Sequence, residues 1–202
     1  MDREEAITKL KELEGKELHE LAKFYNITIH KGEKVNKGWA GHVIERYLEL
    51  PLNSAQSPNF GSWELKTIPL QYKRNGKLRF KETMAITMID EVNVKQKEFE
   101  GSHLLSKLQK IVVVARIVGN HVDEPSTVYS VTDFDLTANL YKKIKEDYDL
   151  VRSTLKDPTK GFNALTGKMG YYIQPRTKGA GHGSTSRAFY ARPRFLQEFI
   201  KI

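Results

Sequence analysis

Three segments near the start of the chain carry apolar residues at helical spacing. Residues 3–14, 18–24 and 38–50 each repeat apolar side chains every three to four positions, so each predicts an amphipathic helix with one face on a core. Pro51 ends the third segment, because proline cannot continue a helix. The polar and basic residues 30–37 predict a loop before that helix.

Strand patterns dominate the middle of the chain. Residues 62–70 alternate between two faces and lead to an Asn-Gly pair at 75–76, the preferred two-residue hairpin turn. We therefore expect a returning strand over residues 78–89. The β-branched run at 110–115 predicts a buried strand, and residues 126–132 predict another.

The last elements mix helices with one more strand. Ser102 is placed to cap a short helix, and residues 137–155 form a long amphipathic stripe. Residues 171–175 predict a strand, and residues 193–200 predict a closing helix. This mixture of helices and strands predicts an α/β (α+β) fold.

Length and composition limit the class of protein. A chain of 202 residues is long enough for one sizeable core, so we expect a single domain, residues 1–202. The absence of cysteine excludes disulfide scaffolds, cysteine-ligated zinc and thiol nucleophiles, and it fits a reducing cytoplasm. The longest apolar run, residues 111–118, is interrupted by Arg116 and falls short of the roughly 20 residues that span a bilayer. We expect a soluble, cytoplasmic protein without a membrane partner.

Positive charge is concentrated at the end of the chain. The net charge is +8, and residues 160–202 hold eight Lys or Arg against one acid, Glu198. A basic surface that includes Tyr171, Tyr172, Phe189 and Tyr190 suits a polyanion such as nucleic acid, although a solvated basic face explains the charge equally well. The Gly-rich and hydroxyl-rich loop 176–187 can follow a phosphate backbone closely or serve as a connector, and its basic flanks favour DNA contact.

Two charged residues share a face of the first predicted strand. Because side chains alternate along a strand, Glu64 and Lys66 point the same way. On a solvated face they form an ordinary ion pair worth under about 1 kcal/mol. In a cleft, Glu64 can hold a metal ion and Lys66 can orient or deprotonate a water molecule. The spacing alone leaves both interpretations open.

Three separated segments form a more specific pattern: Lys37-Gly38-Trp39-Ala40-Gly41-His42-Val43-Ile44-Glu45, Glu64-Leu65-Lys66-Thr67-Ile68-Pro69 and Ser102-His103-Leu104-Leu105-Ser106-Lys107-Leu108. In order and spacing they resemble the MutH family, which joins the strand-nicking endonuclease of methyl-directed mismatch repair to type II restriction enzymes that cut at GATC. This resemblance implies a PD-(D/E)-x-K nuclease: a restriction-endonuclease-like mixed β-sheet flanked by helices, with two lobes around a DNA-binding cleft.

The resemblance also implies an active site that depends on Mg²⁺. Glu64, Asn59 and Leu65 would occupy the metal-ligand positions, and Lys66 would position or activate the water. Glu45 would be the helix carboxylate of the site, and Lys107 a second lysine near the scissile phosphate. These residue types suit the reaction, because carboxylates attract Mg²⁺ and the metal stabilises the charge of the transition state.

Residues at the C-terminal end would contact double-stranded DNA. Tyr190 matches a tyrosine that the repair enzyme places near the methylated adenine, and the basic residues around it are the other expected contacts: Arg176, Lys178, Arg187 and Arg192. In the repair branch the chain would also respond to a mismatch-repair partner protein.

Asn59 departs from the family pattern. The family has an aspartate before the Glu-x-Lys strand, whereas this chain has Asn59-Phe60, and no aspartate occurs between Asp2 and Asp90. An amide keeps the shape of the carboxylate without its charge, which weakens Mg²⁺ binding. The chain is therefore naturally impaired, or carries an exchange that blocks cutting, or compensates through Glu45.

Three hypotheses follow from the sequence. The first is a Mg²⁺-dependent, sequence-specific DNA endonuclease that hydrolyses phosphodiester bonds at a GATC-like site, as a repair nickase or a restriction enzyme. The second is a DNA-binding module with a nuclease fold that does not cleave. The third is an unrelated basic interaction domain.

Overall fold

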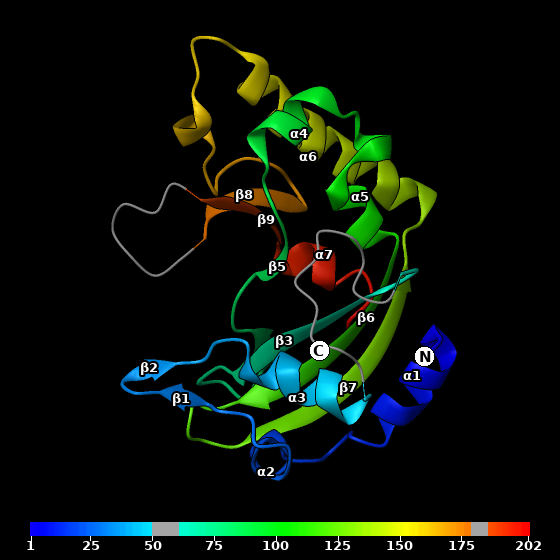
Figure 1. Ribbon diagram of the computed structural model, residues 1–202, viewed down its shortest axis with the longest axis vertical. Coiled ribbons are helices and arrows are strands. Elements are labelled where there is room, and N and C mark those ends of the chain that lie inside the picture. The colour runs from blue at the N-terminus through cyan, green and yellow to red at the C-terminus, as the bar shows by residue number, and fades with distance from the viewer. Residues whose placement is uncertain (50–60, 179–185) are drawn as a thin grey trace.

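A four-stranded mixed sheet lies at the centre of the computed structural model, which describes residues 1–49, 61–178 and 186–202 (Figure 1). Its strands follow the order β4-β3-β6-β7: β3 (Glu64–Tyr72), β4 (Leu78–Phe80), β6 (Lys110–Val118) and β7 (Ser126–Asp135). β3 and β6 are parallel, and the two outer strands pair antiparallel. The parallel register places Glu64 beside Ile111 and Lys66 beside Val113.

A second, antiparallel sheet has the order β5-β9-β8 and consists of β5 (Met84–Met88), β8 (Ile173–Thr177) and β9 (Arg187–Ala191). The single returning strand predicted over residues 78–89 is therefore wrong. β4 pairs with β3 over three residues, and the chain then crosses to β9 because Met84 and Ile86 are buried in the core shared with that sheet.

Two further strand predictions need correction. β8 begins at Ile173 rather than at Tyr171, because the carboxylate of Asp147 accepts the backbone N–H groups of residues 171–173. The loop predicted over residues 30–37 contains a small antiparallel hairpin of β1 (His30–Lys31) and β2 (Lys34–Val35). Gly32 lies in its turn at φ +61°, where glycine is favoured.

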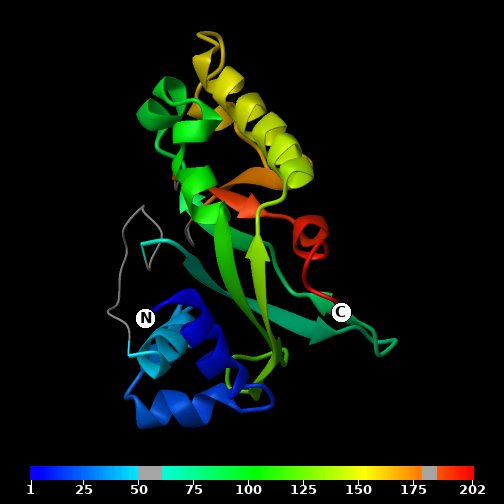
Figure 2. The same cartoon turned by 90° about the vertical axis from the view of Figure 1, so that its right-hand side faces the viewer.

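The three N-terminal helices cover one face of the four-stranded sheet (Figure 2). They match the predicted segments with shorter bounds: α1 (Arg3–Lys11), α2 (Leu18–Phe24) and α3 (Trp39–Tyr47). Their buried side chains pack with Trp63 and Leu65 of the strand region and with Val112 and Val114 of β6. This face of the sheet therefore has its own apolar cluster.

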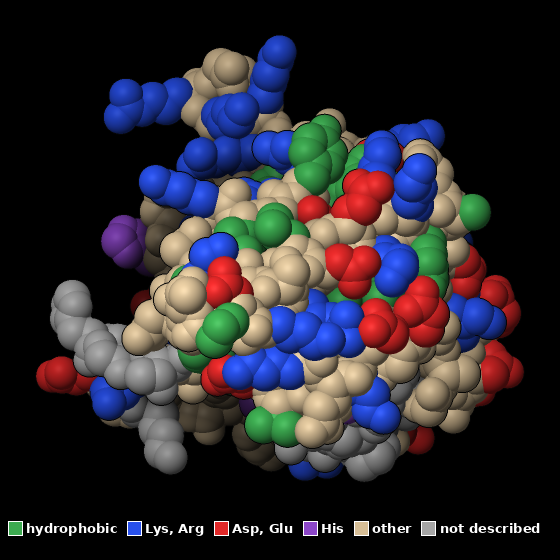
Figure 3. Space-filling model, turned by 90° about the horizontal axis from the view of Figure 1, so that it is seen from above, with side chains coloured by type: hydrophobic (Ala, Val, Ile, Leu, Met, Phe, Trp, Pro, Cys, Tyr) green, Lys and Arg blue, Asp and Glu red, His purple; other side chains and the backbone are tan. Residues whose placement is uncertain are grey.

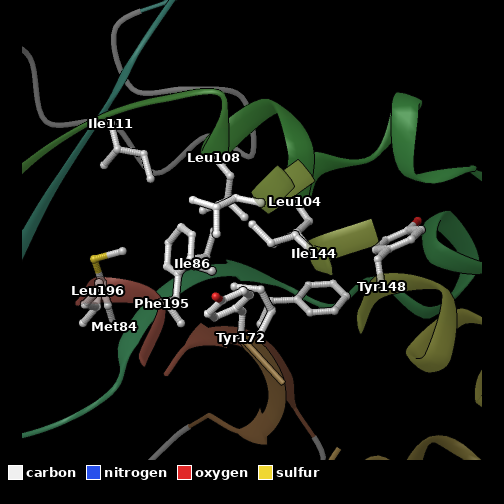
Figure 4. Packing of buried hydrophobic residues seen from close by; sticks show 14 of the residues in the cluster. Met84, Ile86, Leu104, Leu108, Ile111, Ile144, Tyr148, Tyr172, Phe195 and Leu196 are labelled. Carbon is white, nitrogen blue, oxygen red and sulfur yellow. The ribbon is translucent and has the colours of Figure 1, made fainter. Parts of the chain in front are cut away.

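The opposite face packs against the larger cluster in Figure 4, which joins both sheets to the later helices. Those helices are α4 (Glu91–Gln96), α5 (His103–Leu108), α6 (Ala138–Lys156) and α7 (Pro193–Leu196), with short 3-10 turns η1 (Phe99–Gly101) and η2 (Phe162–Ala164). Ser102 caps α5 and Thr137 caps α6 through bonds to backbone N–H groups. The predicted closing helix is shorter, ending at Leu196.

The observed fold confirms a mixed α/β class with sheets flanked by helices. Two aromatic residues expected on a basic surface are instead buried in the core, since Tyr172 is 4% and Phe189 2% exposed. The arrangement as one domain with two lobes stays a prediction. Among the described residues, no helix is long and apolar enough to cross a membrane.

Candidate active site

A buried carboxylate with two lysine partners lies at the start of β3. The side chain of Glu64 is 0% exposed, and its Oε1 is 2.6 Å from Nζ of Lys66. Nζ of Lys107 lies 3.2 Å from Oε1 and 3.4 Å from Oε2 of the same carboxylate. The structure therefore brings together three predicted site residues from two elements, β3 and α5.

Strand alternation explains the pairing within β3. Glu64 and Lys66 share the face on which Ile68 and Leu70 enter the larger core, while Leu65 points into the cluster under α1–α3. One face of β3 thus changes from charged to apolar along its length. The charged pair lies where that face meets the boundary of the core.

The short helix α5 supplies Lys107 in its last turn. Its neighbours Leu104, Leu105 and Leu108 are buried in the larger core, so the helix is held against the sheet and Lys107 is carried inward with it. Burial lowers the pKa of Lys107, although the nearby Glu64 carboxylate opposes this shift. Positive charge on Lys66 and Lys178 lowers it further.

A β-bulge supplies another contact to the site. Ala85 pairs with Tyr190 and Thr87 with Phe189, so Ile86 is the extra residue in β5. Nζ of Lys66 donates to the carbonyl oxygen of Ile86 at 3.3 Å. Lys66 of the first sheet is therefore bonded to an irregular point in the second sheet.

Glu45 adds a second carboxylate from α3. Its side chain is half-buried, and its pKa is raised first by burial and then by the negative charge of Glu64, while Lys66 opposes the shift. Glu45 therefore lies close enough to Glu64 to feel its charge. Asn59, the remaining predicted catalytic and metal position, lies outside the described residues.

The carboxylates of this site suit a Mg²⁺ ion that keeps several waters better than a metal ion held by protein ligands alone. Within residues 1–49, 61–178 and 186–202, no three His, Cys, Asp or Glu side chains gather in a way that would hold a metal ion. Mg²⁺ needs fewer, since it usually binds one or two carboxylates and keeps several waters. Two mutually repelling carboxylates, Glu45 and Glu64, fit that requirement, because a cation between them would relieve their repulsion.

Exposed basic residues lie along the chain from α6 to β8. In the view from above, Lys and Arg side chains gather at one edge of the surface, and acidic and basic side chains mix elsewhere (Figure 3). Lys160, Lys168, Arg176 and Lys178 are exposed. The guanidinium of Arg176 lies 5.7 Å from the ring centroid of Tyr190 and donates to Oγ1 of Thr83.

Two other predicted DNA contacts, Arg187 and Arg192, bind carbonyl groups of the protein itself. Arg187 donates from Nε to the carbonyl oxygen of Leu165. Arg192 donates to the carbonyl oxygens of Gly167 at 2.8 Å and Met169 at 3.0 Å. Both side chains therefore position the segment before β8, a role that their charge alone did not indicate.

Asp147 is a structural residue that the sequence reasoning missed. Its buried carboxylate accepts the N–H groups of Tyr171 at 2.6 Å, Tyr172 at 2.7 Å and Ile173 at 2.8 Å. Its position offered a signal, because it lies between Ile144 and Tyr148, on the apolar stripe of α6. A charged residue on such a stripe needs buried partners.

Comparisons with known proteins agree on one family. The family model described as "DNA mismatch repair enzyme MutH" matches residues 48–147, which include Glu64, Lys66 and Lys107 but not Glu45 or the C-terminal basic residues. The DNA mismatch repair protein MutH of Vibrio campbellii is 30% identical over 112 residues, 54% of this chain and 48% of that protein. In this match the chain spans about half the length of its relative.

Two further matches extend over nearly the whole chain. The DNA mismatch repair protein MutH of Haemophilus influenzae is 22% identical over 215 residues, covering 98% of this chain and 94% of that protein. A solved complex of the restriction endonuclease MvaI with its cognate DNA substrate aligns with a TM-score of 0.42 and 13% identity, covering 98% of this chain and 97% of that chain.

Proposed function

The chain belongs to the MutH family, and we propose that it is a Mg²⁺-dependent DNA endonuclease whose active site comprises Glu64, Lys66, Lys107 and Glu45. The observation that carries the proposal is the contact of the Glu64 carboxylate with two lysines beside a second carboxylate. A purely structural ion pair needs neither the second lysine nor a like charge nearby, since both add cost at a buried position.

The chain's own residues have distinct roles in this proposal. Lys66 orients the attacking water through its ammonium N–H groups at the partly exposed edge of the site, and the proton of the water passes to bulk solvent. The water oxygen then bonds to phosphorus as the bond from phosphorus to the leaving oxygen breaks, and the leaving oxygen takes up a proton. Lys107 neutralises charge on the phosphate.

Glu64, Glu45 and the main-chain carbonyl of Leu65 are the groups that would hold the metal. When bound, Mg²⁺ supplies electrostatic stabilisation of the charge that builds on the phosphate oxygens. Position 59 contributes an amide where the family has a carboxylate, so metal affinity is reduced. Glu45 compensates for part of that loss.

Double-stranded DNA is the proposed substrate, with a short GATC-like palindrome as the recognition site. Arg176, Lys178 and Tyr190 would contact the duplex, because the two basic residues are exposed and the positive charge of Lys178 reaches Lys107. Arg187 and Arg192 would act indirectly by holding the adjoining loop. If the chain is a repair nickase, a mismatch-repair partner protein would control its cleavage of one strand. If it is a restriction enzyme, it would cut both strands without a partner.

A non-cleaving DNA-binding module is the second candidate, favoured by Asn59. We would compare the chain with Asn59→Asp on supercoiled plasmid and on unmethylated, hemimethylated and methylated GATC duplexes, with Mg²⁺ and with a chelator. Cleavage that appears or rises strongly in Asn59→Asp, with equal DNA binding in both, supports a weakened endonuclease. Tight binding without cutting by either chain supports the binding module and contradicts the endonuclease.

Glu91→Gln is a suitable matched control for that assay. Glu91 is a carboxylate on the surface of α4, where it forms an ion pair with Lys95 at 2.7 Å. Its replacement should leave cleavage unchanged. A cleavage map without a common short sequence would contradict the GATC-like preference while leaving the nuclease proposal intact.

A further inference from the structure

A surface pocket of about 360 Å³ lies near the carboxyl ends of the parallel strands β3 and β6. Its walls come from the β2 end, the start of α3, the segment after β4, the end of β6 and the loop before β7; they include Val35, Lys37, Trp39, Lys81, Arg116 and Val118. Its size falls within the range of roughly 300–1,000 Å³ that is typical of small-molecule sites.

This pocket is separate from the candidate active site. Arg116 pairs with Pro69 and follows Val112 and Val114 on the face covered by α1–α3. Glu64 and Lys66 point to the opposite face, beside Ile111 and Val113. A ligand in the pocket would thus bind on the other side of the sheet from Glu64, Lys66 and Lys107.

The guanidinium of Arg116 has fewer hydrogen-bond acceptors than its largely buried position requires. It donates from one terminal nitrogen to Oγ of Ser126 at 2.9 Å and lies 5.5 Å from the ring centroid of Trp39. Its Nε is buried and has no hydrogen-bond partner among the described residues. Burial lowers the pKa of Arg116, and the charge of Glu82 only partly offsets this shift.

The indole beside Arg116 has packing partners of its own. Trp39 is 2% exposed, and its ring lies 4.6 Å from the ring of His19, tilted by 41°. His19 in turn contacts Glu17 and the carbonyl oxygen of Val122. These contacts restrain the indole before a ligand binds, which lowers the entropic cost of binding.

We propose that this pocket binds a small organic anion, with its carboxylate or phosphate on the guanidinium of Arg116 and its apolar or aromatic part against Trp39, Val35 and Val118. Guanidinium matches the geometry of a carboxylate or phosphate through two parallel hydrogen bonds. Lys37 and Lys81, exposed at the lining, add positive charge at the entrance, and together with Arg116 they outnumber the two acidic residues of the lining, Glu82 and Glu124. The anion would add acceptors for the terminal nitrogens of Arg116, one of which already donates to the hydroxyl of Ser126.

The test is an equilibrium titration of the full chain, in buffer with a chelator and no divalent cation, with phenyl phosphate and with benzoate. Tryptophan fluorescence reports binding, because Trp39 lines the pocket. We expect saturable binding of at least one probe, and the stronger of the two identifies the anion. Inorganic phosphate and uncharged phenol should each bind at least about tenfold more weakly, since each offers only half of the contacts.

Arg116→Gln should weaken the better probe at least about tenfold, because it removes a charge-assisted contact. Arg79→Gln is the matched control, since Arg79 is exposed on β4. The Arg79→Gln chain should bind the better probe with the affinity of the unmodified chain. If Arg116→Gln does not fold, Arg116→Lys takes its place in the titration. Lysine keeps the positive charge but cannot form two parallel hydrogen bonds, so the affinity of this variant for the probe should still fall.

Three results would overturn the proposal. The first is no saturable binding of either probe up to about 10 mM, which corresponds to a negligible affinity. The second is equal affinity in a folded Arg116 variant and in the unmodified chain. The third is displacement of the bound probe by a short DNA duplex, which would assign the pocket to the DNA path.

Discussion

The two buried carboxylates among the described residues, Glu64 and Asp147, are neutralised in different ways. Asp147 accepts three backbone N–H groups from consecutive residues, which cannot move without breaking the fold. Glu64 has two lysine side chains among its partners, each with its ammonium on a flexible four-carbon stem. Fixed main-chain donors suit a structural role, whereas replaceable side-chain cations suit a site that must exchange partners with a metal and a substrate.

The largest expected effect is on cleavage by a Glu64→Gln variant, made together with Asn59→Asp if the unmodified chain does not cut. Loss of the metal-binding charge should lower the cleavage rate about a thousandfold or more, because metal stabilisation of a transition state is worth several kcal/mol. Single-turnover cleavage of a GATC duplex measures this effect. Near-normal cleavage by a folded Glu64→Gln chain would remove Glu64 from the active site.

Asp147→Asn should mainly reduce stability. An amide oxygen is a weaker acceptor than a carboxylate, and its NH₂ group faces backbone donors, so we expect the free energy of unfolding to fall by about 3 kcal/mol. Urea unfolding measures it, with Asp149→Asn as the control because the Asp149 side chain is 44% exposed and pairs with Lys145. If Asp147→Asn lost cleavage activity while its free energy of unfolding stayed unchanged, the structural role of Asp147 would be contradicted.

A smaller effect concerns the pH dependence of stability through Glu45. Burial and the charge of Glu64 raise the pKa of Glu45, so the folded protein binds more protons than the unfolded chain between the ordinary and the raised value. The contribution of Glu45 to stability therefore falls as pH rises through that window. With a chelator present, Glu45→Gln should remove this decline, so its urea midpoint, taken as the difference from the unmodified chain, should rise between about pH 4 and pH 7.

Glu64→Gln sharpens this measurement. It removes the like charge that contributes to the raised pKa of Glu45, so it should also reduce the pH dependence, though less than Glu45→Gln, because burial is the larger cause. An unchanged pH dependence in both variants would mean that Glu45 does not interact with Glu64.

Local patterns predicted much of the fold, because helices and strands depend on side-chain periodicity within one segment. The alternation that places Glu64 and Lys66 on one face held, and Ser102 caps its helix as expected. The crossing of β5 to a second sheet was not predictable, since an Asn-Gly turn fixes the start of a hairpin but not the length over which its strands stay paired.

The residues of the candidate site could be predicted less well from local patterns than from family resemblance. No spacing rule brings Lys107 to Glu64, because the two residues are 43 positions apart in the chain and meet only when α5 packs on the sheet. Arg187 and Arg192 look like DNA contacts by charge, yet both bind carbonyl groups of the protein. Whether a basic side chain is free for a ligand depends on tertiary partners that the sequence does not display.

Through the bulge at Ile86, strand β5 of the second sheet also contacts the first sheet. The neighbouring Ala85 is registered with Tyr190, and the carbonyl oxygen of Ile86 receives the Lys66 ammonium. Tyr190 of the second sheet and Lys66 of the first sheet are therefore connected through two adjacent residues of β5, Ala85 and Ile86. If the extra residue of the bulge were deleted, β5 would keep a regular pairing with β9 but would lose the carbonyl oxygen that bonds Lys66.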